Sequence, residues 1–234
     1  MSSPAVSAAD LRQHYFAPDG QVLLDLRIDT FVLPAGAQCA VSGASGVGKT
    51  TFMNLLAGLL PVEQGKLAIA GEELSGTGEA ERDRIRGRHI GLVFQRFHLL
   101  TEFTALENLV IAQNCAGRHD PEFAGELLDR LGLASHRNQP PHRLSAGQQQ
   151  RLAVARALAN RPRLVLADEP TGNLDPRTAA VAIGALREIC QQHDAALLVI
   201  THDPVIAGSF ERHDHLALHD GAARLTEHPG RVEA

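Results

Sequence analysis

The chain has 234 residues, 44% of which are hydrophobic, and it carries a formal net charge of −5 at neutral pH. This length suits one α/β domain with a subdomain and allows a substantial hydrophobic core. The mild acidity argues against broad nucleic-acid binding, and no apolar run approaches the roughly 18–20 residues of a membrane span. The three cysteines lack metal-ligand spacing, and the first residues carry neither basic charge nor an apolar run, so we expect a reduced cytosolic setting.

The first strand that the sequence predicts covers residues 21–28, where leucine and isoleucine alternate with polar neighbours. A proline and a glycine at 34–36 then indicate a turn. Residues 39–41 predict a second strand, which leads directly into a glycine-rich loop.

This loop, Gly43–Thr50, fits G-x-x-x-x-G-K-[ST] at every fixed position. Glycines let successive backbone N–H groups point at a phosphate chain, and the helix that follows presents its positive end to the same anion. Lys49 can then reach the β- and γ-phosphates, and the Thr50 hydroxyl can ligate Mg²⁺. The motif therefore predicts a nucleotide site formed by Ser45, Gly46, Val47, Gly48, Lys49, Thr50 and Thr51.

Beyond this loop and its helix, the chain returns to strand-like patterns. Residues 66–70 alternate and, with residues 21–28, suit an antiparallel sheet beside the nucleotide core. Residues 79–88 are heavily charged and indicate a solvated helix or loop. Residues 90–94 are apolar throughout and predict a buried strand that ends at Gln95.

The middle of the chain is predicted to be helical. Apolar residues recur at helical spacing over 104–111 and 121–133. A double proline then breaks the chain before Leu144–Gln148, where Ser145 stands at the N-cap position of an alanine-rich helix.

Two acidic residues follow the next predicted strand. Residues 164–167 are apolar on both faces, as a central parallel strand must be, and Asp168 and Glu169 come at its C-terminal end. Two carboxylates at the tip of a buried strand would be costly without a function there. Asp175 and Pro176 then have the pattern of a helix start.

The last predicted strand, residues 196–200, is again wholly apolar and is followed by His202. Residues 216–225 read as a hairpin with a type I′ turn at Asp220 and Gly221. Together the elements predict a mostly parallel sheet with crossover helices, in which ligands gather at the C-terminal ends of the strands. The P-loop, Gln95, the two carboxylates and His202 are therefore expected to converge around one Mg·nucleotide.

With the P-loop, Gln95, LSAGQ, LVLADEP, NLD and His202 in this order, the chain resembles the nucleotide-binding domain of ABC transporters over essentially its whole length. The resemblance implies a P-loop NTPase (RecA-like) parallel-sheet core with an antiparallel β subdomain and an α-helical signature subdomain. It implies one ABC ATPase domain over residues 1–234, with the helical subdomain inserted at about 96–160.

The resemblance also implies roles for the residues at the strand ends. Asp168 matches the aspartate that holds Mg²⁺, together with Thr50 and Gln95, and Glu169 matches the catalytic glutamate that polarises the attacking water. Gln95 matches the residue that touches Mg²⁺ or water and senses the membrane partner. His202 matches the histidine that contacts the γ-phosphate. With Lys49, these residues make up the expected catalytic set, and ATP and Mg²⁺ are the expected cofactors.

Three further matches concern the base and the second subunit. Tyr15, the only tyrosine, matches the aromatic residue that stacks on adenine; the alternative is a surface role. Leu144–Gln148 matches the signature motif, in which Ser145, Gly147 and Gln148 face the P-loop of a second copy. Asp175 matches the loop that crosses to the other subunit. The family more often has glycine where this chain has Ala146, a change that removes no hydrogen-bond donor.

Residues 94–100, 104–108 and 170–175 resemble the branch that contains lipoprotein-releasing (LolD-type), MacB-type and FtsE-type ATPases. The expected partners are a second copy of the chain and a separate integral-membrane permease, which would place the chain on the cytoplasmic face of the inner or plasma membrane as a peripheral protein. Residues 96–100 and the helix from Thr104 would line a groove for that permease; alternatively, Phe97, Leu99 and Leu100 pack inside the helical subdomain.

Three other functions remain open on the sequence. One is the ATPase subunit of an importer. Another is a soluble ABC ATPase that acts on nucleic acid or ribosomes, although the chain has neither a second cassette nor a long insertion between Lys49 and Ser145. The third is a regulatory cassette that binds ATP without hydrolysis, against which the presence of Glu169 and His202 argues.

Overall fold

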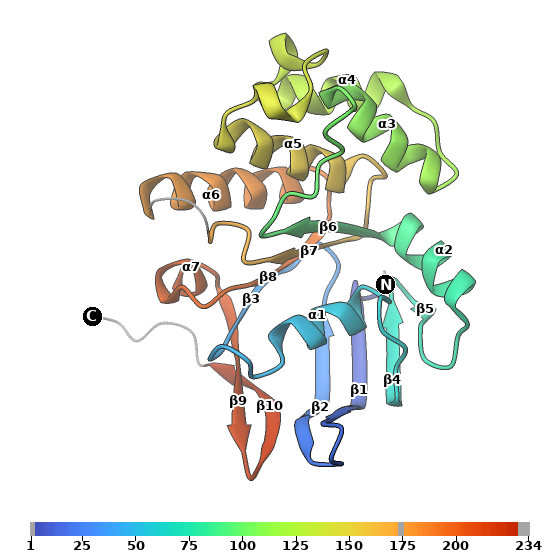
Figure 1. Cartoon of the computed structure of the whole chain (residues 1–234), viewed down its shortest axis with the longest axis vertical. Helices are drawn as coiled ribbons and strands as arrows, with labels where there is room; N and C mark the ends of the chain where they lie inside the picture. Colours follow the sequence, from blue (N-terminus) through green and yellow to red (C-terminus); the bar gives the residue numbers. More distant parts are fainter. Residues whose placement is uncertain (1–2, 173–175, 229–234) are drawn as a thin grey trace.

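The computed structural model describes residues 3–172 and 176–228 (Figure 1). Its strands are β1 (Val6–Phe16), β2 (Val22–Leu33), β3 (Gln38–Ser42), β4 (Gln64–Ile69), β5 (Glu72–Glu73), β6 (Ile90–Phe94), β7 (Leu164–Asp168), β8 (Ala196–Ile200), β9 (Arg212–His219) and β10 (Ala222–His228). Within the described ranges they form a ten-stranded sheet in the order β5-β4-β1-β2-β10-β9-β3-β8-β7-β6. The half from β9 to β6 is parallel, whereas β5, β4, β1 and β2 pair antiparallel.

The helices are α1 (Lys49–Leu56), α2 (Glu79–His89), α3 (Ala105–Cys115), α4 (Pro121–Arg130), α5 (Ala146–Leu158), α6 (Pro176–Gln192) and α7 (Pro204–Gly208), with short 3₁₀ turns at Ala134–His136 and Pro141–Arg143. Figure 1 shows α1 on one face of the parallel strands, and α5 and α6 on the other, with α3 and α4 beyond α5. The predicted parallel core with crossover helices is confirmed.

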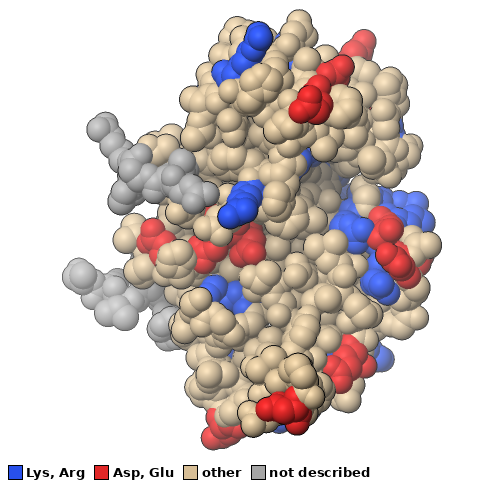
Figure 2. Space-filling model, viewed as in Figure 1, with Lys and Arg blue, Asp and Glu red and all other residues tan. Residues whose placement is uncertain are grey.

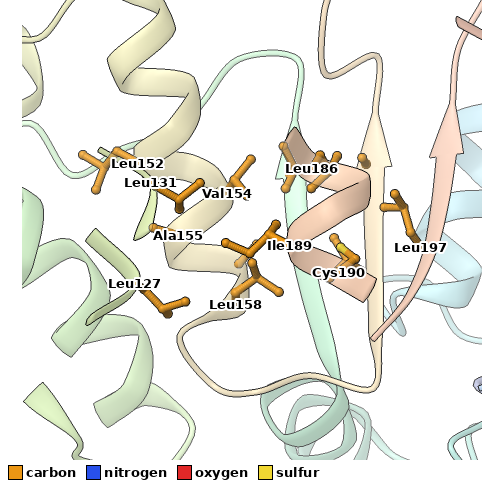
Figure 3. Packing of buried hydrophobic residues seen from close by; sticks show 14 of the residues in the cluster. Leu127, Leu131, Leu152, Val154, Ala155, Leu158, Leu186, Ile189, Cys190 and Leu197 are labelled. Atoms are coloured by element: carbon orange, nitrogen blue, oxygen red, sulfur yellow. The ribbon is translucent and has the colours of Figure 1, made fainter. Parts of the chain in front are cut away.

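The parallel strands are buried because helices cover both of their faces. Every residue of β8 is buried, and its side chains alternate between two cores: Leu197 and Val199 face the helical layer, whereas Leu198 and Ile200 face α1. Figure 3 shows the first of these cores, where α5 and α6 pack side by side over the sheet. The unbroken apolar sequence of β8 therefore correctly predicted that this strand lies inside the sheet, with helices on both faces.

The edge strand β6 is also protected, although it ends the sheet. At Gly91, an added Cβ would lie 2.3 Å from the carbonyl oxygen of Ala157 in α5. Only glycine allows this approach, and it brings the backbone of α5 onto the strand. The helix that begins at the predicted signature motif is thereby fixed against the strand that ends at Gln95.

The structure corrects the prediction for the N-terminal region, because the strand predicted at 21–28 is the second strand and not the first. The preceding strand, β1, was missed: its buried residues Val6 and Ala8 are followed by Leu11, which breaks a strict alternation. Asp10 lies between them with a φ of +52°, and the pairing with β4 shifts register there. Tyr15 accordingly lies within β1, near its end.

Other expected boundaries needed smaller changes. The antiparallel strands continue the nucleotide-binding sheet and do not form a separate one, because β10 pairs with β2 through Ala223 and Arg224. The charged segment at 79–88 is a helix, and the helix predicted at 121–133 ends at Arg130. Asp220 and Gly221 have φ values of +51° and +80°, as a type I′ turn requires. No helix within the described residues is long and apolar enough to cross a membrane.

Candidate nucleotide site

The P-loop connects the central strand β3 to α1 and forms an anion cradle. Gly46 and Gly48 have φ values of +77° and +107°, a backbone conformation that side chains disfavour. Gly48 is the N-cap of α1, and no side chain in the described part of the protein caps this helix. The first N–H groups of α1 therefore lack a side-chain acceptor, and together with the helix dipole they favour an anion.

Lys49 holds a positive charge directly over this cradle. Its Nζ donates to the carbonyl oxygens of Gly43 at 2.8 Å and of Ala44 at 2.9 Å. These two contacts fold the lysine side chain back along the loop. A phosphate chain lying on the loop would thus contact the ammonium group as well as the backbone N–H groups.

A pair of carboxylates faces the start of α1. The Thr50 hydroxyl lies 3.4 Å from Oδ2 of Asp168, at the end of β7. Burial raises the pKa of Asp168, and the neighbouring carboxylate of Glu169 raises it further, while Thr50 and Lys49 oppose the shift. An environment that disfavours two negative charges is one that a cation would stabilise.

Glu169 is held in an unusual backbone conformation. Its φ is +44°, in the left-handed region, and its N–H donates to the carbonyl oxygen of Ile200 at 2.9 Å. Its Oε1 lies 2.8 Å from Nδ1 of His202, just beyond β8. Non-glycine residues persist in this region when surrounding contacts compensate for the strain, and such residues cluster at functional sites. Neighbouring strands thus bring Glu169 and His202 together.

Most residues predicted at the P-loop and at the strand ends share one cavity of about 400 Å³. Its walls comprise Leu24, Ser45, Gly46, Gly48, Lys49, Thr50, Thr51, Gln95, Asp168, Glu169 and His202. Gln95 enters from the end of β6 and lies against the backbone of Gly172, where an added Cβ would come within 2.8 Å of its Nε2. The convergence expected from the strand ends is therefore present in the fold; the catalytic and metal-binding roles remain predictions.

Among the predicted residues of the P-loop and of β1, Val47 and Tyr15 do not line this cavity. The side chain of Val47 is buried in the core beneath the loop, so any contact from this residue comes from its backbone. Tyr15 pairs across the strands with Leu24, which does line the cavity. Because directly opposed residues share one face of a sheet, the ring of Tyr15 lies next to the cavity. Tyr15 as a whole residue is 38% exposed.

The signature residues lie elsewhere, at the start of α5. Ser145 Oγ accepts from the backbone N–H of Gln148 at 3.3 Å, and Gln148 Oε1 accepts from the backbone N–H of Ser145 at 2.8 Å. This reciprocal capping box confirms the predicted N-cap. Ser145 is exposed, and a Cβ added at Gly147 would meet no atom within 4 Å. None of these residues lines the cavity at the P-loop, and Asp175 lies outside the described residues.

Sequence reasoning missed two residues that shape the site. Leu24 forms a wall of the cavity. Leu24 and Leu26 are two residues apart in a strand and so share one face, and this spacing could have placed Leu24 on the side of the P-loop. Gln150 is buried in α5 and donates from Nε2 to the carbonyl oxygen of Pro170 at 2.9 Å, directly after Glu169. A glutamine among the alanines and valine of a buried helix face is the signal that could have revealed it.

Comparison with known proteins agrees with this geometry. The family model for ABC transporter matches residues 26–172. The chain is 42% identical to "Lipoprotein-releasing system ATP-binding protein LolD" of Pseudomonas fluorescens, over 92% of this chain and 96% of that protein. It is 39% identical to the protein of the same name from Alcanivorax borkumensis, over 95% of this chain and 98% of that one.

Two solved structures of the ATP-binding cassette MJ0796 have the same fold. One, described as a dimeric structure of a bacterial ABC transporter cassette, superposes with a TM-score of 0.80 at 31% identity and covers 95% of this chain and 98% of that chain. The other is described as a dimeric post-hydrolysis state bound to ADP and Pi, and it superposes with a TM-score of 0.77 at 30% identity over the same shares of the two chains. The chain therefore belongs to the ABC transporter family, as an ATP-binding subunit that hydrolyses ATP.

Proposed function

We propose that two copies of this chain close around two Mg·ATP and thereby drive a separate integral-membrane permease of the lipoprotein-releasing type. The observation that carries this proposal is the separation of two anion-binding helix starts. The P-loop cavity holds the carboxylates and His202, whereas the exposed Ser145 and the half-buried Gly147 lie at the start of α5 and do not line that cavity. Each chain thus supplies one part of two different nucleotide sites.

The resemblance to relatives supports the same arrangement. The MJ0796 cassettes are dimers in both solved structures, one of them with ADP and Pi bound. The lipoprotein-releasing function is inferred from the names of the relatives, which match over almost their whole length. An importer ATPase is the alternative within the family, and a soluble non-transport ABC ATPase is the alternative outside transport.

The residues at the start of α1 suit Mg²⁺. A hydroxyl and a carboxylate, from Thr50 and Asp168, provide hard oxygen donors of the kind that this ion prefers, and the amide oxygen of Gln95 can join them. When bound with ATP, the ion would neutralise the developing charge on the transferred phosphoryl group. The unfavourable pairing of Asp168 with Glu169 would then be offset, because a cation lies beside both carboxylates.

Catalysis would come mainly from positioning and charge stabilisation. We infer that Glu169 orients the attacking water and that His202, in hydrogen-bond contact with it, fixes the direction of its carboxylate. Lys49 would bind the β- and γ-phosphates. Tyr15, beside the cavity on β1, would stack on adenine. The signature residues Ser145 and Gly147 would contact the γ-phosphate held by the other chain.

A second hollow shares His98 with the segment predicted to line the permease groove. A cavity of about 550 Å³ lies between α2, β6, α3 and α5, and its walls include Phe94, His98 and Cys115. Leu99 packs against the core, whereas Leu100 and Phe103 are exposed. The segment after Gln95 therefore contributes both to the core and to the surface. We propose that a helix from a cytosolic loop of the permease docks here.

The proposal is tested with the variant Glu169→Gln. We expect this variant to bind ATP, to accumulate as a dimer in size-exclusion chromatography with light scattering, and to lose roughly 10²-fold or more of its turnover. The matched control is Glu188→Gln, an exposed change on α6 that should leave turnover unchanged. An unaltered rate in Glu169→Gln would remove Glu169 from the catalytic role.

The permease is tested by capture from native membranes. Tagged Glu169→Gln protein with Mg·ATP is incubated with detergent-solubilised membranes, and the bound proteins are identified by mass spectrometry. Recovery of a permease with few spans and a large extracytoplasmic domain supports the lipoprotein-releasing branch. A permease with many spans and a solute-binding protein supports an importer, and ribosomal proteins without any membrane protein would overturn the transporter proposal.

A further inference from the structure

Arg156 is a partly buried cation in α5, the helix that begins at the signature motif. Its neighbours Ala155 and Ala157 are buried, and burial lowers the pKa of its guanidinium. Within the described residues, no carboxylate lies within ion-pairing distance of Arg156. A guanidinium removed from water without a counter-ion needs hydrogen-bond acceptors instead.

Those acceptors are two consecutive backbone carbonyls of the segment that follows Gln95. The Nη2 of Arg156 donates to the carbonyl oxygen of Phe97 at 2.8 Å, and Nη1 donates to the carbonyl oxygen of His98. These residues lie 59 and 58 positions away in sequence. The planar fork of an arginine matches two acceptors in a way that the single ammonium of a lysine does not.

The backbone of this segment explains how one side chain reaches both carbonyls. His98 has a φ of +46°, in the left-handed region. Consecutive carbonyls point to the same side in helical backbone, whereas they alternate in extended backbone. The turn at His98 thus presents both oxygens to Arg156. A non-glycine residue stays in this region only when its surroundings hold it there.

This turn lies between the nucleotide site and the proposed permease groove. His98 follows Gln95 by three residues, and Gln95 lines the nucleotide cavity. His98 and Arg156 both line the cavity of about 550 Å³ between α2, β6, α3 and α5. The ring of His98 also contacts Phe94, with 5.2 Å between the ring centroids. A displacement of this turn would therefore change both regions.

We propose that Arg156 is a positioning residue for ATP hydrolysis. It fixes the left-handed turn at His98, and through that turn it sets the direction of Gln95 in the nucleotide cavity. Because Arg156 belongs to α5, it also joins the signature helix to the segment that borders the groove. The inference rests on the proposed role of Gln95, and its test separates the two.

The first test compares Arg156→Lys with Arg118→Lys by steady-state ATP hydrolysis. Arg118 also donates to a backbone carbonyl, that of Asn160, but not to the segment after Gln95. We expect Arg156→Lys to lower kcat roughly tenfold through misplacement of Gln95, with KM changed by less than about twofold because the P-loop is intact. Arg118→Lys should retain the wild-type kcat. If thermal melting shows that Arg156→Lys is unfolded, Arg156→Gln, which keeps a planar amide donor, replaces it.

The second test uses rescue. His98→Gly removes the steric cost of the left-handed turn, so we expect it to restore at least about half of the kcat lost in Arg156→Lys. A general packing defect in α5 would not respond to a change of backbone freedom at residue 98. Absence of rescue in a folded double variant would overturn the proposal.

A structural readout keeps this test independent of activity. Cys115 is exposed at the same cavity, whereas Cys39 and Cys190 are buried with thiol pKa values raised to about 12, so a spin label reacts at Cys115. With a second label at Arg96→Cys, the distance distribution measures the order of the turn. It should broaden in Arg156→Lys and narrow again with His98→Gly.

The outcomes separate the two hypotheses. Gln95→Ala should lower kcat by itself, and Arg156→Lys should have little further effect in that background. If Gln95→Ala retains full activity, the proposed role of Gln95 fails, and with it the link to catalysis. If Gln95→Ala is impaired but the distance distribution and kcat of Arg156→Lys equal those of the wild type, the inference about Arg156 is wrong.

Discussion

The starts of α1 and α5 are the two helix ends for which we propose anion binding, and they differ in whether a side chain caps them. At α1 the N-cap is Gly48, no side chain within the described ranges caps the helix, and Lys49 lies over the loop. At α5, Ser145 and Gln148 cap each other at the protein surface. At the first helix start, no side chain of the described residues accepts from the helix N–H groups, whereas at the second the N–H of Gln148 donates to Ser145 Oγ.

The difference suits the two tasks that we propose. A P-loop followed by a helix start without a side-chain cap can bind phosphate in a single chain, because the first N–H groups of α1 are available to the anion. A self-capped helix start can stay ordered while it is exposed, and in our proposal it contacts a nucleotide only when a second chain supplies one. The four predictions below test this contrast, from the largest expected effect to the smallest.

Charge distribution adds to the contrast. The carboxylates of Asp168 and Glu169 lie beside α1, where a cation would offset their repulsion. Figure 2 shows that Lys and Arg gather at the right of this view, over α2, where Arg84 and Arg88 are paired with Glu72. Those cations are thus engaged in local ion pairs. Among the described residues that line the P-loop cavity, the Lys or Arg side chain is that of Lys49.

Lys49→Ala is expected to have the largest effect. It removes the cation over the P-loop, and a hydrogen bond to a charged group contributes about 1.5–3 kcal/mol, which corresponds to roughly 10- to 150-fold weaker ATP binding. Isothermal titration calorimetry measures this change. Lys66→Ala, on β4 and outside the cavity, serves as the control. Unaltered affinity in Lys49→Ala would contradict the P-loop assignment.

Ser145→Ala tests the other helix start, and Thr104→Ala is its matched control. Both residues form a capping box, with Gln148 in α5 and Glu107 in α3. Each change should lower the free energy of unfolding by about 1 kcal/mol, as measured by urea denaturation. Only Ser145→Ala should also weaken ATP-dependent dimerisation and turnover. Equal activity in the two variants would show that the start of α5 is only structural.

Asp168→Asn tests the repulsion between the carboxylates of Asp168 and Glu169, with the free energy of unfolding measured as a function of pH. The pKa of Asp168 is raised above its ordinary value of 3.8, so the folded state binds more protons than the unfolded state, and the carboxylate destabilises the fold at neutral pH. The free energy of unfolding of Asp168→Asn should therefore exceed that of the wild type at pH 7. The difference should shrink as pH falls through the raised pKa towards 3.8.

Asp120 provides a control of opposite sign. Its pKa is lowered by the backbone N–H of Phe123 and by Arg161, so its charge stabilises the fold at pH above its ordinary value of 3.8. Asp120→Asn should lower the stability at pH 7, and this loss should disappear as pH falls below that value. If both variants shift stability in the same direction, the electrostatic account of Asp168 is incorrect.

Sequence patterns correctly predicted the elements whose structure depends on one local property, such as burial on both faces of a strand or the chemistry of a short motif. The strands around Val93, Leu166 and Leu198 were found with nearly the right bounds, because burial on both faces requires an unbroken apolar run. The P-loop and the carboxylates were found because their chemistry is local. By contrast, β1 was missed because the left-handed backbone at Asp10 interrupts its alternation.

The remaining features depend on contacts between distant parts of the chain. Leu24 contributes to the nucleotide cavity only because β2 lies beside the P-loop. Arg156 and His98 meet across 58 positions, and no periodicity within either segment records that contact. The strain at Glu169 is likewise invisible in sequence, since its φ of +44° follows from the way β7 and β8 bring it to His202.

Ala146→Gly should have the smallest effect. Ala146 is exposed at the first turn of α5, and its methyl group occupies no donor position. Glycine disfavours helix by up to about 1 kcal/mol, so the melting temperature should fall slightly, while turnover should change by less than about twofold. Ala80→Gly, an exposed change in the first turn of α2, gives the helix cost alone. A tenfold gain in turnover from Ala146→Gly alone would show that the methyl group limits the approach of the second chain. Steric hindrance at Ala146, and not the capping box, would then limit contact at the start of α5.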